Sequence, residues 1–327
     1  MLNEVKSASG GKKIALVFPG QGSQYVGMGR EFYEKYSIAK ETFDAANEIL
    51  GYDLKKIIFE GPLELLTQTI YTQPAVFVTS VACFKVFSSL FNLHSPLILS
   101  AGHSLGEYSA LAAAEVLPFE ELLKVVKARA QFIEAACQKT KGTMLAVIGS
   151  ENTLKAIVSE ICSEASANGV CEAVNFNAPG QIIISGDIVA IEKAKEISKS
   201  KKIRAMPLPV SGAFHSSLMK EAASNMKEEL KKYKFRDPKF PVVTNCDAKI
   251  TTTADEIPQK LSKQIDSPVL WDESIRRILS EGCETFVELG PKNVLTGMIK
   301  KIVPSAKTYN IENEITLTFF LEAFRNV

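Results

Sequence analysis

A single serine stands between two glycines in the stretch LILSAGHSLGEYSALAAA, residues 97 to 114. The five residues from Gly102 to Gly106 fit the pattern G-x-S-x-G, and they fall where a buried, strand-like run gives way to good helix formers. A serine in such a turn exposes its hydroxyl near a helix N-terminus, whose N–H groups and dipole favour developing negative charge. The pattern predicts that Ser104 is a nucleophile. The alternative is that Ser104 only caps the helix.

A serine hydroxyl is a weak nucleophile at neutral pH and needs a base within hydrogen-bond reach. The chain has three histidines. His103 is adjacent to the serine, so its side chain would point away from the same turn, and His94 lies in the loop before the strand. His215, in PVSGAFHSSLM, lies in a glycine-containing loop just before a predicted helix. Elimination favours His215 as the base, and the alternative is a polar residue on the surface.

One arginine interrupts the apolar face of a predicted amphipathic helix. In FEELLKVVKARAQFIEAACQ, Arg129 falls in the middle of a stripe made by Leu122, Val125, Val126, Phe132, Ile133 and Ala136. A buried guanidinium without a partner is costly, so an anion is expected beside it. Two partners are left open by the pattern. One is an internal Glu or Asp, and the other is a substrate carboxylate held in two-pronged geometry.

The segments that must position these residues alternate between strand-like and helix-like patterns. KIALVFPG and PLILSAG are typical of buried strands, and each is followed by helical stretches. From Gly142 to Pro207 the predicted order is strand, helix, strand, strand, helix, strand, which is the ferredoxin-like βαββαβ pattern. After Pro209 strand-like and helix-like segments again alternate, with a short strand PVVTN, a helix around Trp271, a strand TFVELG and two more helical stretches.

This alternation predicts an α/β protein of two domains. We expect residues 1–137 and 208–327 to form a large hydrolase-like domain, with a parallel sheet and a nucleophile elbow at Ser104. We expect residues 138–207 to form a small ferredoxin-like domain inserted into it. Clefts between domains are favoured binding sites, so the substrate is expected between the two.

Composition limits the classes of function. The chain has 327 residues, of which 46% are hydrophobic and 23% charged, as in soluble globular proteins. Its formal net charge of +1 gives no reason to expect nucleic acid or an anionic membrane as the main partner. The six cysteines have no regular spacing, so neither a metal site nor a disulfide framework is predicted. The polar start has no apolar core, and no apolar run approaches the ~20 residues of a membrane span. We expect a cytoplasmic protein.

Seven motifs together resemble the malonyl-CoA:acyl-carrier-protein transacylases. They are FPGQGSQYVGMG, GHSLGEYSA, Arg129, NFNAPGQIIISG, VSGAFHSSLM, SPVLW and ELGPKNVLTGM. The match runs from about residue 13 to 303. The resemblance implies transfer of a malonyl group from malonyl-CoA to the phosphopantetheine thiol of acyl carrier protein, for fatty acid synthesis. It implies ping-pong kinetics through a malonyl ester and no cofactor. We expect a monomer that meets an acidic carrier protein transiently.

The same resemblance implies roles for individual residues. Ser104 would carry the malonyl group, with His215 as its acid–base partner, and Arg129 would hold the free malonyl carboxylate. The main-chain N–H groups of Gln21 and Leu105 would form the oxyanion hole.

Three further residues are implied at the same site. Gln264 matches the position whose neighbourhood orients the histidine, which leaves a Ser-His dyad without an acidic third member. Phe214 would crowd the extra methyl group of methylmalonyl. His103 counts among the substrate-binding residues.

Basic side chains are candidates for contact with the carrier. The inserted domain carries a dense basic run, whose alternative is an ordinary solvated face: Lys193, Lys195, Lys199, Lys201, Lys202 and Arg204. In GPKNVL, Lys292 stands one place before the position where relatives often have a basic residue, which leaves its part in carrier or coenzyme binding open.

Two rival functions remain. A serine hydrolase or thioesterase would pass the acyl group to water, but the chain has no HGGG-like motif and Arg129 suits a charged acyl group. A non-catalytic carrier-binding subunit would keep the fold without turnover, and the intact Ser104, His215 and Arg129 argue against it.

Overall fold

The computed structural model describes residues 13–93, 98–210 and 212–325. The polar start and His94 lie outside the described residues. The strands are β1 Lys13–Phe18, β2 Ile98–Gly102, β3 Gly142–Ile148, β4 Cys171–Ala178, β5 Gln181–Asp187, β6 Arg204–Pro207, β7 Val242–Val243, β8 Ile250–Thr251, β9 Cys283–Leu289 and β10 Lys307–Ile311. The helices are α1 Arg30–Lys35, α2 Ser37–Leu50, α3 Leu54–Glu60, α4 Leu63–Leu66, α5 Thr69–Leu90, α6 Gly106–Ala113, α7 Phe119–Lys139, α8 Glu151–Ala165, α9 Ile188–Ser200, α10 Lys220–Leu230, α11 Ile257–Gln264, α12 Trp271–Ser280, α13 Val294–Ile302 and α14 Glu314–Arg325. Short 3₁₀ turns are η1 Ser166–Asn168, η2 Ser217–Met219 and η3 Ala254–Glu256.

The larger sheet is mainly parallel and confirms the α/β class. Its strand order is β10-β9-β1-β2-β7-β8, and only β8 pairs antiparallel to its neighbour. The edge strands β8 and β10 were not predicted. The first has two residues, and the second, KTYNI, is largely half-exposed, so neither carries the apolar run that marks a buried strand.

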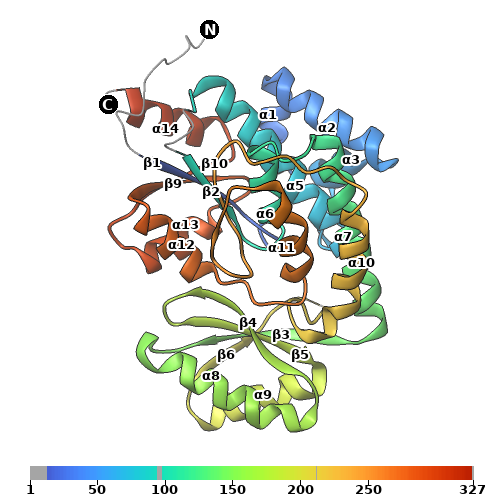
Figure 1. Ribbon diagram of the computed structural model, residues 1–327, viewed down its shortest axis with the longest axis vertical. Helices are drawn as coiled ribbons and strands as arrows, with labels where there is room; N and C mark the ends of the chain where they lie inside the picture. The colour runs from blue at the N-terminus through green and yellow to red at the C-terminus, as the bar shows by residue number, and fades with distance from the viewer. Residues whose placement is uncertain (1–12, 94–97, 211, 326–327) are drawn as a thin grey trace.

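Helices cover both faces of this sheet (Figure 1). Along β1, Ile14, Leu16 and Phe18 point into the core shared with α2, α5, α6 and α7. The alternate residues Ala15 and Val17 point into a second core beneath α12 and α13. The two-residue period of a strand therefore explains why β1 is apolar on both faces from Ile14 to Phe18.

A second sheet of four antiparallel strands lies beside the first, in the order β4-β5-β3-β6 (Figure 1). One of its faces packs on α8 and α9. The opposite face, through Met144, Ala146, Val174 and Ile183, packs against the segment that leads to Phe214. The chain crosses between the two sheets near Val269, whose N–H and C=O groups bond to β4 at 2.8 and 3.0 Å.

Helix α5 is long and apolar enough to span a membrane by length and composition alone. The sequence was expected to contain no such run, and this expectation was wrong. However, 78% of the apolar window of α5 is buried inside the protein, which is typical of a core helix.

Candidate active site

Ser104 lies on a sharp turn between β2 and α6. Its φ of 51° is left-handed, which is uncommon for a residue other than glycine. The turn is tight on both sides of the serine. A Cβ added to Gly102 would lie 1.9 Å from the main chain of Gly106, and one added to Gly106 would lie 2.0 Å from the carbonyl oxygen of Phe18. The strand and helix predicted on either side of Ser104 are both present, and the two glycines are required by close backbone approach.

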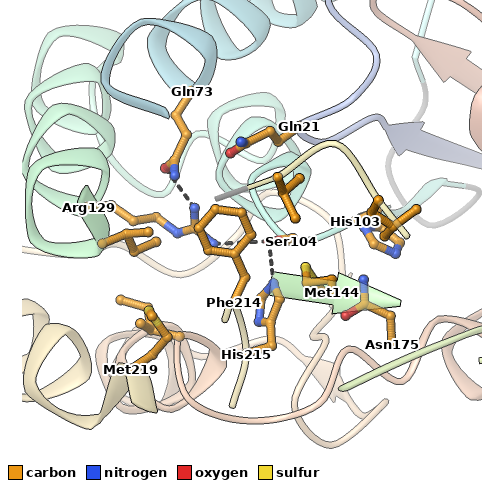
Figure 2. A pocket seen from close by; sticks show the side chains of 14 residues that line it. Gln21, Gln73, His103, Ser104, Arg129, Met144, Asn175, Phe214, His215 and Met219 are labelled. Carbon is orange, nitrogen blue, oxygen red and sulfur yellow. Dashed lines mark hydrogen bonds between the residues drawn. The ribbon is translucent and has the colours of Figure 1, made fainter. Parts of the chain in front are cut away.

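The Ser104 hydroxyl does not cap α6, which has no side-chain cap, so that alternative was wrong. Its Oγ lies 2.7 Å from Nε2 of His215 and accepts a 3.0 Å hydrogen bond from Arg129 (Figure 2). The serine oxygen thus lies between an imidazole and a guanidinium.

His215 is buried and fixed from both ring nitrogens. Nδ1 lies 2.9 Å from the main-chain oxygen of Gln264, an acceptor, so Nδ1 carries the proton and Nε2 presents its lone pair to Ser104. Burial, and next the nearby charge of Arg129, lower the pKa of His215 to about 3. The histidine is therefore neutral at physiological pH and oriented by a carbonyl, with no carboxylate hydrogen-bonded to its ring among the described residues.

Arg129 comes from the apolar face of α7 and is only 2% exposed. Its partners are neutral: it donates to Gln73 Oε1 at 2.7 Å and to Gln264 Oε1 at 3.1 Å, besides Ser104. Its guanidinium also lies over the Tyr108 ring, 5.3 Å from the centroid. Within the described ranges no carboxylate is ion-paired with it, so the alternative of an internal salt bridge was wrong. Its Nε has no partner, and burial lowers the pKa of Arg129.

The two residues expected to supply N–H groups flank this arrangement. Gln21 lines the pocket in the loop after β1, and Leu105 directly follows the serine at the start of α6. No acceptor for either main-chain N–H is found in the part of the chain that the structure describes. Lys292 reaches the same loop, because its Nζ lies 3.4 Å from the carbonyl oxygen of Gly22.

His103 points away from the serine hydroxyl (Figure 2). Its Nε2 lies 2.8 Å from Asn177 Oδ1, and its ring packs edge-to-face on Trp271 with centroids 5.6 Å apart. Burial lowers the pKa of His103. The residue joins the turn to strand β4 and does not contact Ser104 Oγ.

A pocket opens over Ser104, with about 680 Å³ of space that is partly open to solvent. Apolar side chains form much of its wall, and Phe214 lines it together with Arg129 and Ser104 (Figure 2). Across the serine from Arg129 lies Asn175, which is 9% exposed and whose Oδ1 has no hydrogen-bond partner.

Sequence reasoning missed three buried polar residues at this site: Gln73, Glu107 and Asn245. Gln73 interrupts an apolar helix in TQPAVFVTS, and Glu107 interrupts GEYSALAAA, so a polar residue within an apolar helix was the available signal. Asn245 follows the two-residue strand β7 and carries no such signal.

In the described ranges, no three His, Cys, Asp or Glu side chains are grouped as metal ligands would be. The six cysteines are all unpaired thiols.

The basic run of the smaller sheet is partly neutralised. Lys193 and Lys195 pair with Glu196 and Glu192 on the same helix, at 3.1 and 3.3 Å. Lys201 pairs with two acidic residues of α8, at 2.9 and 3.3 Å. Half of the predicted basic residues are therefore engaged with acids of their own chain.

The chain matches the acyl transferase domain family over residues 15–316. It is 40% identical to the malonyl CoA-acyl carrier protein transacylase of Bacillus subtilis, over 96% of this chain and 98% of that one. The crystal structure of the corresponding enzyme of Clostridium perfringens superposes with a TM-score of 0.90 at 38% identity, covering 96% and 98% of the two chains. A malonyl-transacylase solved in complex with a type II PKS acyl carrier protein gives a TM-score of 0.90 at 37% identity, covering 95% of this chain and 100% of that one. The chain therefore belongs to the acyl transferase family, among its malonyl CoA-acyl carrier protein transacylases.

Proposed function

We propose that this protein transfers the malonyl group of malonyl-CoA to the phosphopantetheine thiol of acyl carrier protein, through a malonyl ester of Ser104. One observation carries the proposal. Ser104 Oγ lies 2.7 Å from a neutral histidine and 3.0 Å from a buried arginine whose partners are all uncharged. This combination suits a serine nucleophile whose acyl group bears a carboxylate.

In the first half-reaction His215 accepts the Ser104 proton at Nε2 while Oγ attacks the thioester carbonyl carbon. The negative charge that develops on the carbonyl oxygen is held by the N–H groups of Gln21 and Leu105, for which no other acceptor is found within the described ranges. The carbon–sulfur bond then breaks, and His215 returns the proton to the CoA thiolate. The second half-reaction repeats these steps in reverse with the carrier thiol.

Two residues set the choice of acyl group. Arg129 binds the malonyl carboxylate as its first anionic partner, with a planar fork suited to two parallel hydrogen bonds. Phe214 lines the same pocket and would crowd a methyl group on the malonyl carbon. One methyl group is worth only about 10- to 200-fold in discrimination, so Phe214 sets a preference.

The acidic carrier would approach over the smaller sheet. With three lysines of the basic run engaged, the exposed Lys199, Lys202 and Arg204 are left as its contacts. The relative solved in complex with an acyl carrier protein supports a carrier as partner.

We also propose the division into a hydrolase-like domain of residues 1–137 and 208–327 and a ferredoxin-like domain of residues 138–207. The strand order β4-β5-β3-β6, produced by a βαββαβ chain, supports the second assignment. A cytoplasmic, monomeric enzyme that needs no cofactor remains our prediction.

The test is the intact mass of the protein after brief mixing with malonyl-CoA, followed by a chase with phosphopantetheinylated carrier. The malonyl adduct should appear on the wild type, be absent from Ser104→Ala, and move to the carrier faster than to water. An adduct lost equally fast without carrier indicates a hydrolase. Absence of any adduct contradicts the assignment of Ser104 and favours a non-catalytic carrier-binding subunit.

A further inference from the structure

The peptide groups that carry Ser104 are bonded to two side-chain amides from distant parts of the chain. Asn245 Oδ1 accepts the Ser104 N–H at 2.7 Å, and Asn245 Nδ2 donates to the Gly102 carbonyl at 2.7 Å. Gln264 Nε2 donates to the Ser104 carbonyl at 2.9 Å. Both amide side chains are fully buried. Side-chain amides therefore bond to three main-chain groups of the turn: the Gly102 carbonyl, the Ser104 N–H and the Ser104 carbonyl.

These bonds stabilise the left-handed backbone conformation of Ser104. A left-handed serine costs of order 1–3 kcal/mol and persists only where its surroundings fix it. The glycines at 102 and 106 permit the close approach of the backbone but also add conformational freedom. Fixing the Ser104 peptide groups thus fixes the direction of Oγ and of the next N–H, that of Leu105.

A buried carboxylate holds the two amides in place. Glu107 Oε2 accepts the main-chain N–H of Asn245 at 2.9 Å and Gln264 Nε2 at 2.9 Å. Glu107 lies in the first turn of α6, where the helix dipole favours a negative charge. Its other oxygen, Oε1, has no partner, so the bonds through Oε2 are its contribution.

We propose that Asn245 and Glu107 are positioning residues that clamp the turn for catalysis. They act on Ser104 through its peptide groups, without contact with the substrate. Gln264 connects the clamp to Arg129 and His215. Its Oε1 accepts a hydrogen bond from Arg129, and its main-chain oxygen accepts one from His215 Nδ1. The inference rests on the proposed acylation of Ser104.

Asn245→Asp tests the clamp at constant volume. The new carboxylate still accepts the Ser104 N–H, but it cannot donate to the Gly102 carbonyl and repels it. The rate of single-turnover acylation by malonyl-CoA should fall by about 10²-fold, the scale of a lost oxyanion donor. The malonyl-CoA concentration at half-maximal rate should change less than about threefold, since Arg129 is retained.

Glu107 is tested against a matched buried carboxylate, Glu288. Glu288 is also fully buried, accepts two main-chain N–H groups at 3.0 and 2.7 Å, and, like Glu107, has a pKa raised to about 7 by burial. Glu107→Ala should slow acylation at least about tenfold, whereas Glu107→Gln, which keeps an acceptor, should restore the rate to within about fivefold. Glu288→Ala should lower the thermal midpoint without slowing acylation.

The outcomes separate the two proposals. If the wild type forms no adduct, the proposed function fails. If the wild type is acylated and folded Asn245→Asp is acylated equally fast, the clamp fails alone. The clamp is also refuted if Glu288→Ala slows acylation as much as Glu107→Ala does. Should Asn245→Asp not fold, the comparison of Glu107→Ala with Glu107→Gln and Glu288→Ala decides.

Discussion

Replacing Arg129 with alanine should separate malonyl from acetyl as substrates. The guanidinium is buried, and its hydrogen-bond partners are Gln73, Gln264 and Ser104, all uncharged. A malonyl carboxylate would therefore be the first anion to pair with it. An acetyl group has no carboxylate and gains nothing from this charge.

The size of the effect follows from burial. Removing one partner of a buried ion pair costs about 3–5 kcal/mol, and each 1.36 kcal/mol is tenfold in rate. We expect kcat/KM for malonyl-CoA to fall by about 10²- to 10⁴-fold in Arg129→Ala. Acetyl transfer loses the hydrogen bond to Ser104 Oγ, at about 1 kcal/mol, while removal of the charge raises the pKa of His215, so its rate should change by less than about tenfold.

The assay compares kcat/KM for malonyl-CoA and acetyl-CoA with the same carrier protein. Arg129→Lys serves as the matched control, because it keeps the charge and loses the planar fork, so its malonyl rate should be intermediate. Malonyl kinetics that stay within threefold of the wild type refute the role of Arg129. Equal losses for both substrates would instead assign Arg129 to the geometry of Ser104.

Three further predictions concern pH, acyl size and the carrier. The folded pKa of His215, about 3, lies below its unfolded value, so the free energy of unfolding should fall as pH drops from about 6.5 towards 3. Urea titrations at several pH values should detect this loss of stability. The acid limb of the pH profile of kcat/KM should lie below pH 6.5, and a limb at pH 6.5 contradicts the lowering of the His215 pKa by burial. Phe214→Ala should raise the rate of methylmalonyl transfer relative to that of malonyl transfer, by at most about 200-fold in competition assays. Lys199→Glu with Lys202→Glu should raise the KM for carrier in steady-state assays and leave acylation by malonyl-CoA unchanged.

Much of the pairing of Ser104 with His215 could be predicted from the sequence because its signals are local. The turn at Ser104 was predicted from a short pattern between a strand and a helix, and both elements are present. His215 followed from scarcity, since the chain has three histidines. The 2.7 Å contact between the two residues joins positions 111 apart, and no spacing rule predicts it.

The partners of Arg129 were beyond reach of the sequence. An arginine on an apolar face predicts an anion, because unpaired buried charge is costly. In this protein the oxygens of two glutamines and a serine surround the charge instead. A neutral amide gives no charge signal, and Gln264 lies 135 positions away from Arg129.

Some surface ion pairs, unlike the partners of Arg129, could be predicted from the sequence. The pairs Lys193 with Glu196 and Glu192 with Lys195 are three residues apart on a helix, a spacing at which side chains meet. Their mutual neutralisation was therefore readable from the sequence. The ion pairs of Lys201 with α8 depend on how α8 and α9 pack, so the sequence could not predict them.

In the proposed mechanism, the charge of Arg129 would also link recognition of the acyl group to activation of the serine. Without substrate, Arg129 adds to burial in lowering the pKa of His215, so the base is neutral but weak. A malonyl carboxylate bound to Arg129 cancels much of that charge, and the pKa of His215 must then rise towards the range in which general bases are effective. An uncharged acyl group leaves the charge uncompensated and the base weak. In the proposed mechanism, selectivity for a carboxylate would thus arise twice from one buried cation, first in binding and again in proton transfer, which a direct internal salt bridge to Arg129 would have prevented.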